Sequence, residues 1–163
     1  MDKYVLGVQG GITAAFAWLS VKLGSLGPAL MCLLALEALD FVSGMVASKR
    51  EAVEHPDDPT YGWSSKKGAK GIEKKVGYLL VIASALVLDY LIVHVASQIG
   101  INATARGLFG TLTTVWYILN ELLSIVENAG RMGAPVPEWL SKYIATLKAK
   151  IDNQAGEDIH DQQ

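Results

Sequence analysis

The sequence has little of what disulfide-bonded domains and soluble nucleic-acid-binding proteins contain. It has one cysteine, Cys32, so no intramolecular disulfide can form and cysteine usage gives no redox compartment. Charged residues make up 18% of the chain, against roughly 25% in typical soluble domains. The formal net charge of −2 argues against a nucleic-acid partner for the chain as a whole.

The sequence motifs of common enzymes and metal proteins are also missing. No Walker loop, HExxH, paired CxxC or GxSxG motif occurs in the chain. Ser64–Lys67 matches SxxK in letters alone, without the partner motifs of serine acylases. The three histidines, His55, His94 and His160, lack metal-ligand spacing. We therefore expect no enzymatic activity, no catalytic residue, no metal ligand and no cofactor.

Long hydrophobic stretches dominate what is present. They are Tyr4–Val21, Pro28–Ala47, Val76–Ile99 and Gly107–Val126. A transmembrane helix needs about 20 mainly apolar residues, so the pattern predicts an all-α integral membrane protein with a bundle of three to four transmembrane helices. The first stretch is the weakest and is open to two interpretations, a span or a helix lying in the membrane interface. The membrane domain is expected to cover residues 1–134.

Acidic residues interrupt the last three stretches. They are Glu37, Asp40, Asp89 and Glu121. A charged side chain at the bilayer centre costs about 2.5–3.5 kcal/mol, so these residues should face protein, water or one another. Two interpretations follow: the acids line a lumen or hold subunits together, or they form hydrogen bonds between helices of one protomer. The fourth stretch is the most polar of the last three and is expected to pack inside the bundle.

Small residues predict where helices pack closely. Gly7, Gly11 and Ala15 recur every four positions in the first stretch, and Gly44 belongs to a small-residue face in the second. Small residues at this spacing let helices approach one another closely in lipid. We expect these four positions to lie at helix contacts.

A basic loop is predicted at residues 49–75, between the second and third stretches. It begins with a proline-rich segment, His55–Pro59, that cannot continue a helix. Its lysines are expected to contact anionic lipid headgroups, namely Lys66, Lys67, Lys70, Lys74 and Lys75. The positive-inside rule then puts this loop and the C-terminus on the cytoplasmic side.

The C-terminal part has a different character. Trp139, Leu140, Tyr143 and Leu147 recur at helical spacing, with lysines between them. This pattern predicts an amphipathic helix on the membrane surface at residues 135–152. Residues 153–163 are polar and are expected to form a disordered tail.

The order of several motifs resembles one membrane-protein family. Leu39–Gly44 reads LDFVSG, and Ser64–Lys75 reads SSKKGAKGIEKK ahead of a span that carries Leu88-Asp89. Asn120–Gly130 reads NELLSIVENAG and is followed by GAPVP at Gly133–Pro137. In this order the segments resemble the toxin-secretion and phage-lysis holin family (phage holin family 4) of Gram-positive prophages and clostridial toxin loci. The resemblance covers about residues 24–140, and the segment at residues 49–64 is long for the family.

The resemblance implies a function. A member would be a phage-encoded protein of the bacterial cytoplasmic membrane that forms homo-oligomers and opens lesions. These lesions release an endolysin or large toxins, with no catalysis and no cofactor. The implied partners are further copies of the chain, a bilayer with anionic headgroups, and functionally an endolysin. Two other interpretations remain: a small ion or proton channel or transporter, in which Glu37, Asp89 and Glu121 relay ions, and a non-conducting membrane scaffold.

Overall fold

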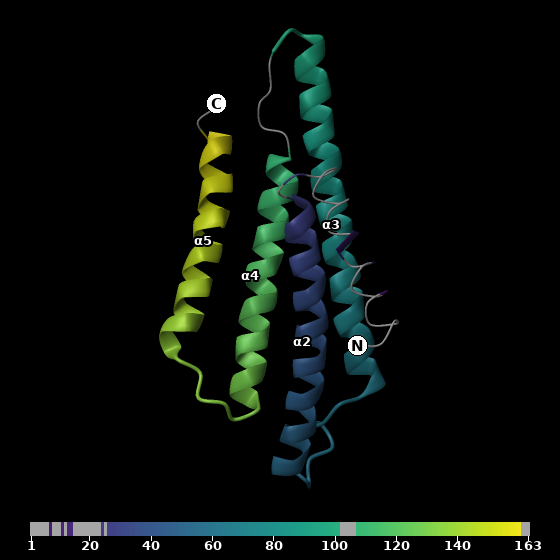
Figure 1. Ribbon diagram of the computed structural model, residues 1–163. Helices are drawn as coiled ribbons and strands as arrows, with labels where there is room; N and C mark the ends of the chain where they lie inside the picture. Colours follow the sequence, from purple (N-terminus) through teal and green to yellow (C-terminus); the bar gives the residue numbers. More distant parts are fainter. Residues whose placement is uncertain are drawn as a thin grey trace.

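The protein is an all-helical bundle in the part of the chain that the structure describes (Figure 1). The computed structural model describes residues 26–101 and 107–160 and positions 7, 11, 13, 14 and 24, with side chains as far as Asp152. These residues form α2 (Leu26–Glu54), α3 (Ser65–Gln98), α4 (Leu108–Arg131) and α5 (Glu138–His160), with no strand among them. The predicted fold class is confirmed. The first hydrophobic stretch lies almost entirely outside the described residues, so its placement stays a prediction.

Helix α4 is the centre of the bundle. It contacts α2, α3 and α5, whereas α5 contacts α4 alone among the described helices. In Figure 1, α2 and α4 run in one direction while α3 and α5 run in the other. The central position has a physical reason: α4 is the least hydropathic of the three long helices, and its polar side chains are best satisfied by neighbouring helices.

Three helices are long and apolar enough to cross a membrane, namely α2, α3 and α4. Their outward surfaces are apolar, with exposed side chains such as Leu39 and Val42 on α2 and Leu80 and Val87 on α3. Inside lies a small core in which Leu33, Ile82, Tyr78 and Tyr117 meet. The two tyrosine rings stack with centroids 3.9 Å apart. An apolar exterior around a partly polar interior suits a lipid solvent.

The predicted basic loop is mostly helical, so its extent was wrong. Helix α2 continues to Glu54 and α3 already begins at Ser65, which leaves residues 55–64 between them. The Ser64 hydroxyl accepts a hydrogen bond from the Lys67 N–H at 3.2 Å and caps α3. Within the turn, the Thr60 hydroxyl and N–H donate to the Asp58 carboxylate and hold the pKa of Asp58 below its ordinary value.

The last helix also differs from the prediction. Helix α5 begins at Glu138 and continues to His160, so residues 153–160 are helical where a disordered tail was expected. It packs along α4 and runs back toward the far end of the bundle, where α5 ends in Figure 1. Polar contacts hold it there. The Trp116 indole N–H donates to Asp152 at 2.7 Å, and the Lys148 ammonium donates to the Asn120 amide oxygen at 3.0 Å.

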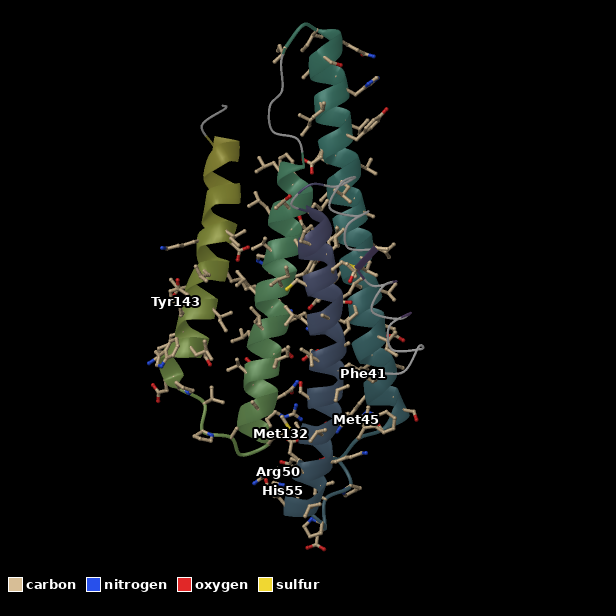
Figure 2. The ribbon with its side chains drawn as sticks, in the orientation of Figure 1. Phe41, Met45, Arg50, His55, Met132 and Tyr143 are labelled. Atoms are coloured by element: carbon tan, nitrogen blue, oxygen red, sulfur yellow. The ribbon has the colours of Figure 1, made fainter. Side chains whose placement is uncertain are left out.

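The turn between α4 and α5 is fixed by α2. The Arg50 guanidinium donates to the carbonyl oxygen of Met132, and Figure 2 shows these two residues at the same end of the bundle. The next residue, Gly133, has φ +82°, and a Cβ atom there would lie 2.7 Å from an Arg50 nitrogen. Only glycine combines this backbone conformation with such a close approach.

Candidate functional site

A group of charged side chains lies inside the bundle where α2, α3 and α4 meet. The Lys75 ammonium of α3 donates to Asp40 Oδ2 of α2 at 2.9 Å and also to Glu121 Oε2 of α4. The Glu121 side chain is fully buried, and 13% of the Lys75 side chain is exposed. Glu37 lies one helical turn before Asp40 on α2 and is buried as well. We call Glu37, Asp40, Lys75 and Glu121 the charged network.

The pairing explains why charges occur at this depth. An isolated ion in an apolar interior costs several kcal/mol, and a partner with good geometry offsets most of that cost. Lys75 satisfies one oxygen of Asp40 and one of Glu121. Two carboxyl oxygens stay buried without a hydrogen-bond partner among the described residues, Oε1 of Glu37 and Oε1 of Glu121. The network is therefore rich in acid and only partly satisfied.

A second set of polar contacts extends the network toward the end of α4. The Asn128 amide donates to Asp40 Oδ1 at 3.1 Å and to Ser43 Oγ at 3.0 Å. Arg131 donates to Asn128 Oδ1 and to both carboxylate oxygens of Glu51, each at 2.8 Å. Together these contacts tie α2 to α4 along one face, where sequence reasoning had identified only Asp40.

Gly44 makes the close contact between α2 and α4 possible, whereas the described residues give no packing role to Gly7 or Gly11. A Cβ atom at Gly44 would lie 3.4 Å from the Asn128 amide nitrogen, so the glycine leaves room for the contact between α2 and α4. Within the part of the chain that the structure describes, nothing lies within 4 Å of a Cβ atom at Gly7 or at Gly11. Ala15 lies outside the described residues. The packing role of the first stretch therefore stays a prediction.

Asp89 is buried too, but it belongs to a different contact. Its carboxylate accepts the N–H groups of Phe109 at 3.0 Å and Gly110 at 2.7 Å, in the first turn of α4. Gly107, which precedes α4, has no side chain to cap it, so Asp89 supplies the cap from α3. Gly110 and Glu121 are 11 residues apart, roughly 16 Å along the helix. Asp89 therefore does not join the charged network.

The five lysines predicted to contact headgroups have different environments. Lys66 and Lys70 are exposed, and Lys67 donates to the carbonyl oxygens of Thr60 and Gly62. The Lys74 ammonium lies 5.4 Å from the Tyr78 ring centroid. For Lys75 the prediction of a contact with lipid headgroups was wrong. It points into the bundle because two carboxylates face it there, so it is not available to lipid headgroups. The sequence held one indication that Lys75 points inward. Lys75 directly precedes the third hydrophobic stretch, and the second and fourth stretches carry acids that need a partner.

A cleft of about 320 Å³ lies beside the charged network, toward the end of the bundle where the turn between α2 and α3 lies. Phe41, Trp63, Lys67 and Ser48 form part of its wall, and Asp40 and Lys75 reach it from the network. No group of three histidine, cysteine or acidic residues able to hold a metal ion occurs within the described residues. The arrangement can pair and store charge between helices, and it offers no nucleophile with an activating base.

Sequence comparison places the chain in a family. Residues 17–149 match the bacteriophage holin family, a region that contains the entire charged network. The chain belongs to this family. The holin-family match also includes Asp89, Asn128, Arg131 and the first half of α5.

The individual relatives include two uncharacterized bacterial proteins and one phage protein named as a probable holin. The chain is 37% identical to an uncharacterized protein of Halalkalibacterium halodurans over 119 residues, which cover 73% of this chain and 77% of the relative. It is 32% identical to an uncharacterized protein of Listeria innocua over 155 residues, or 93% and 90% of the two chains. A protein of Bacillus phage phi105 named as a probable holin is 30% identical over 71 residues, or 44% and 53%. No solved structure matches the chain.

Replacing Lys75 by methionine should destabilise the bundle strongly. The change leaves Asp40 and Glu121 buried without their common partner, and loss of one member of a buried ion pair costs about 3–5 kcal/mol. Thermal unfolding of the protein in detergent micelles measures the effect. Lys70→Met, on the exposed face of the same helix, is the matched control and should change stability little. Equal stability of both variants would contradict the role given to Lys75.

Replacing Asp89 by alanine should loosen the start of α4. Two N–H groups would lose their acceptor, at about 1–3 kcal/mol for an unsatisfied buried group. Hydrogen exchange at the Phe109 and Gly110 amides is the direct measurement, and both should exchange faster. Asp89→Asn keeps one acceptor oxygen and should have a smaller effect. Unchanged protection in Asp89→Ala would mean that the carboxylate does not cap α4.

Proposed function

We propose that this protein is a holin that opens lesions in the bacterial cytoplasmic membrane and lets an endolysin reach the cell wall. One observation carries the proposal: a charged network is buried among three helices that are each long and apolar enough to span a membrane, in a chain of the bacteriophage holin family. Endolysin passage and homo-oligomer formation are the parts that experiment must establish.

The physical argument starts from where polar groups lie in a single copy. The apolar surfaces of α2 and α3 face outward, while Asp40, Lys75 and Glu121 face inward. The wall of a lesion must present polar groups to water on one side and apolar groups to lipid on the other. Helices that separate from one another and associate with further copies meet that requirement. In this proposal Glu37, Asp40 and Glu121 line the opening or pair between copies, and Asp89 keeps α4 intact.

The proposed orientation follows from the distribution of basic residues. Lys49 and Arg50 near the end of α2, Lys66 in the first turn of α3 and Arg131 at the end of α4 belong to the same end of the bundle. Figure 2 shows Arg50, His55 and Met132 together at that end. Basic residues flanking spans are retained on the cytoplasmic side. We therefore place the α2–α3 turn and the start of α5 in the cytoplasm, with Lys66 and Lys70 at anionic headgroups.

Inducible expression beside an endolysin that lacks its own export signal tests the function. We expect abrupt lysis after a delay, with endolysin activity outside the membrane, only when both proteins are present. Culture density and external endolysin activity are the measurements. Depolarisation without endolysin escape would indicate the small channel instead. No effect at verified membrane expression would indicate the scaffold, and either result would contradict the holin proposal.

Replacing Glu121 by glutamine should advance lysis without preventing membrane insertion. The amide still accepts a hydrogen bond from Lys75 but attracts the ammonium less than a carboxylate does, so α3 and α4 should separate sooner. Lysis time at equal membrane abundance is the measurement. Glu127→Gln, at an exposed position of the same helix, is the control. Lysis at the parent's time would contradict the role given to Glu121.

A further inference from the structure

The charged network contains more acid than base. Glu37, Asp40 and Glu121 contribute three carboxyl groups, and among the described residues Lys75 is the single ammonium that bonds to any of them. Asp40 is well satisfied, because Lys75 bonds to one of its oxygens and Asn128 to the other. From the residues that the structure describes, Glu121 receives one hydrogen bond, donated by Lys75. Glu37 receives none from any described residue.

Burial makes this imbalance costly. Glu37 is 7% exposed and Glu121 is fully buried, and Oε1 of each lacks a hydrogen-bond partner among the described residues. An ionised carboxylate can only accept hydrogen bonds, so two neighbouring carboxylates cannot satisfy each other. A buried acid without a partner usually becomes neutral instead of remaining charged. The outward surface of α2 is apolar on either side of Glu37 in the sequence, with Leu34 and Leu39 exposed.

The remaining charged and titratable groups do not remove the imbalance. Lys75 attracts a negative charge on Glu37, but Glu121 opposes it and Asp40 already shares the same lysine. Lys74 on α3 lies over the Tyr78 ring, and it acts on Asp40 and Glu121 from a distance. Tyr117 on α4 stacks on Tyr78. Helix α5 contacts only α4 among the described helices and brings no cation to Glu37.

We propose that Glu37 is a proton-binding site: in the closed protomer it is a neutral carboxylic acid, and it releases its proton to water when the helices separate. Uptake converts the carboxylate and one solvent proton into the acid, and opening reverses that step. A neutral Glu37 buries no charge, and it has an O–H donor that a carboxylate lacks. Glu37 is the better candidate than Glu121, because Glu121 keeps its bond to Lys75. The release step rests on the proposed function, whereas the bound proton does not.

Infrared spectroscopy of the full chain in phosphatidylcholine vesicles tests for the bound proton. At neutral pH the parent should show the carbonyl stretch of a neutral carboxylic acid, shifted in heavy water. Glu37→Gln should lose this band, and Glu54→Gln, at an exposed position of the same helix, should keep it. Absence of the band from the parent, or its persistence in Glu37→Gln, would overturn the proposal. Loss of the band in Glu121→Gln alone would place the proton on Glu121 and would also overturn it.

Thermal unfolding at different pH values gives a second readout that is independent of lysis. A group that binds a proton more tightly when folded contributes stability at low pH and loses it as the pH rises. The parent's Tm should therefore fall as the pH rises from about 4.3, the ordinary pKa of a glutamate, through neutral, and Glu37→Gln should show a smaller fall over the same range. Parallel curves would contradict the proposal. Failure of the lysis test with the infrared band present would reject the holin proposal and leave the proton site intact.

Discussion

The position of Lys75 is the constraint on which the rest of the bundle depends. Its ammonium bonds to α2 through Asp40 and to α4 through Glu121, so one side chain of α3 joins three helices. In a membrane, burial of apolar surface drives helix association weakly, because lipid is as apolar as the core. Polar contacts then decide which helix faces meet. The second set, around Asn128, extends the same contact between α2 and α4.

Under the proposed function, the same interaction makes the closed bundle a suitable starting point for a lesion. Its charges are satisfied only in part, so association with further copies and exposure to water can satisfy groups that the single copy leaves unpaired. A fully satisfied or wholly apolar interior would offer no such gain. The central helix α4 contributes Glu121 and Asn128 to these polar contacts, and α5 covers part of α4 through Trp116 and Asn120.

Much of the architecture could be predicted from local sequence, and the side-chain partners could not. The hydrophobic stretches located α2, α3 and α4 because span length is set by bilayer thickness. Their ends were less accurate, because Lys49–Glu54 and Ser65–Lys75 are polar helical turns beyond the apolar segment. Asp89 shows the other limit. Sequence grouped it with Glu37 and Glu121 by charge, whereas it caps α4 from a neighbouring helix.

By itself the sequence determined that this is a helical membrane protein, which parts can span, and that the acids between them need partners. Composition and the length of each apolar run decide these points, because they set the free energy of transferring each segment from water to lipid. Tertiary structure alone decided that Lys75 turns inward, that Asp89 separates from the other acids and that α5 packs on α4. Those outcomes depend on which helix faces meet, and groups 35 or 46 residues apart come together only when the bundle forms.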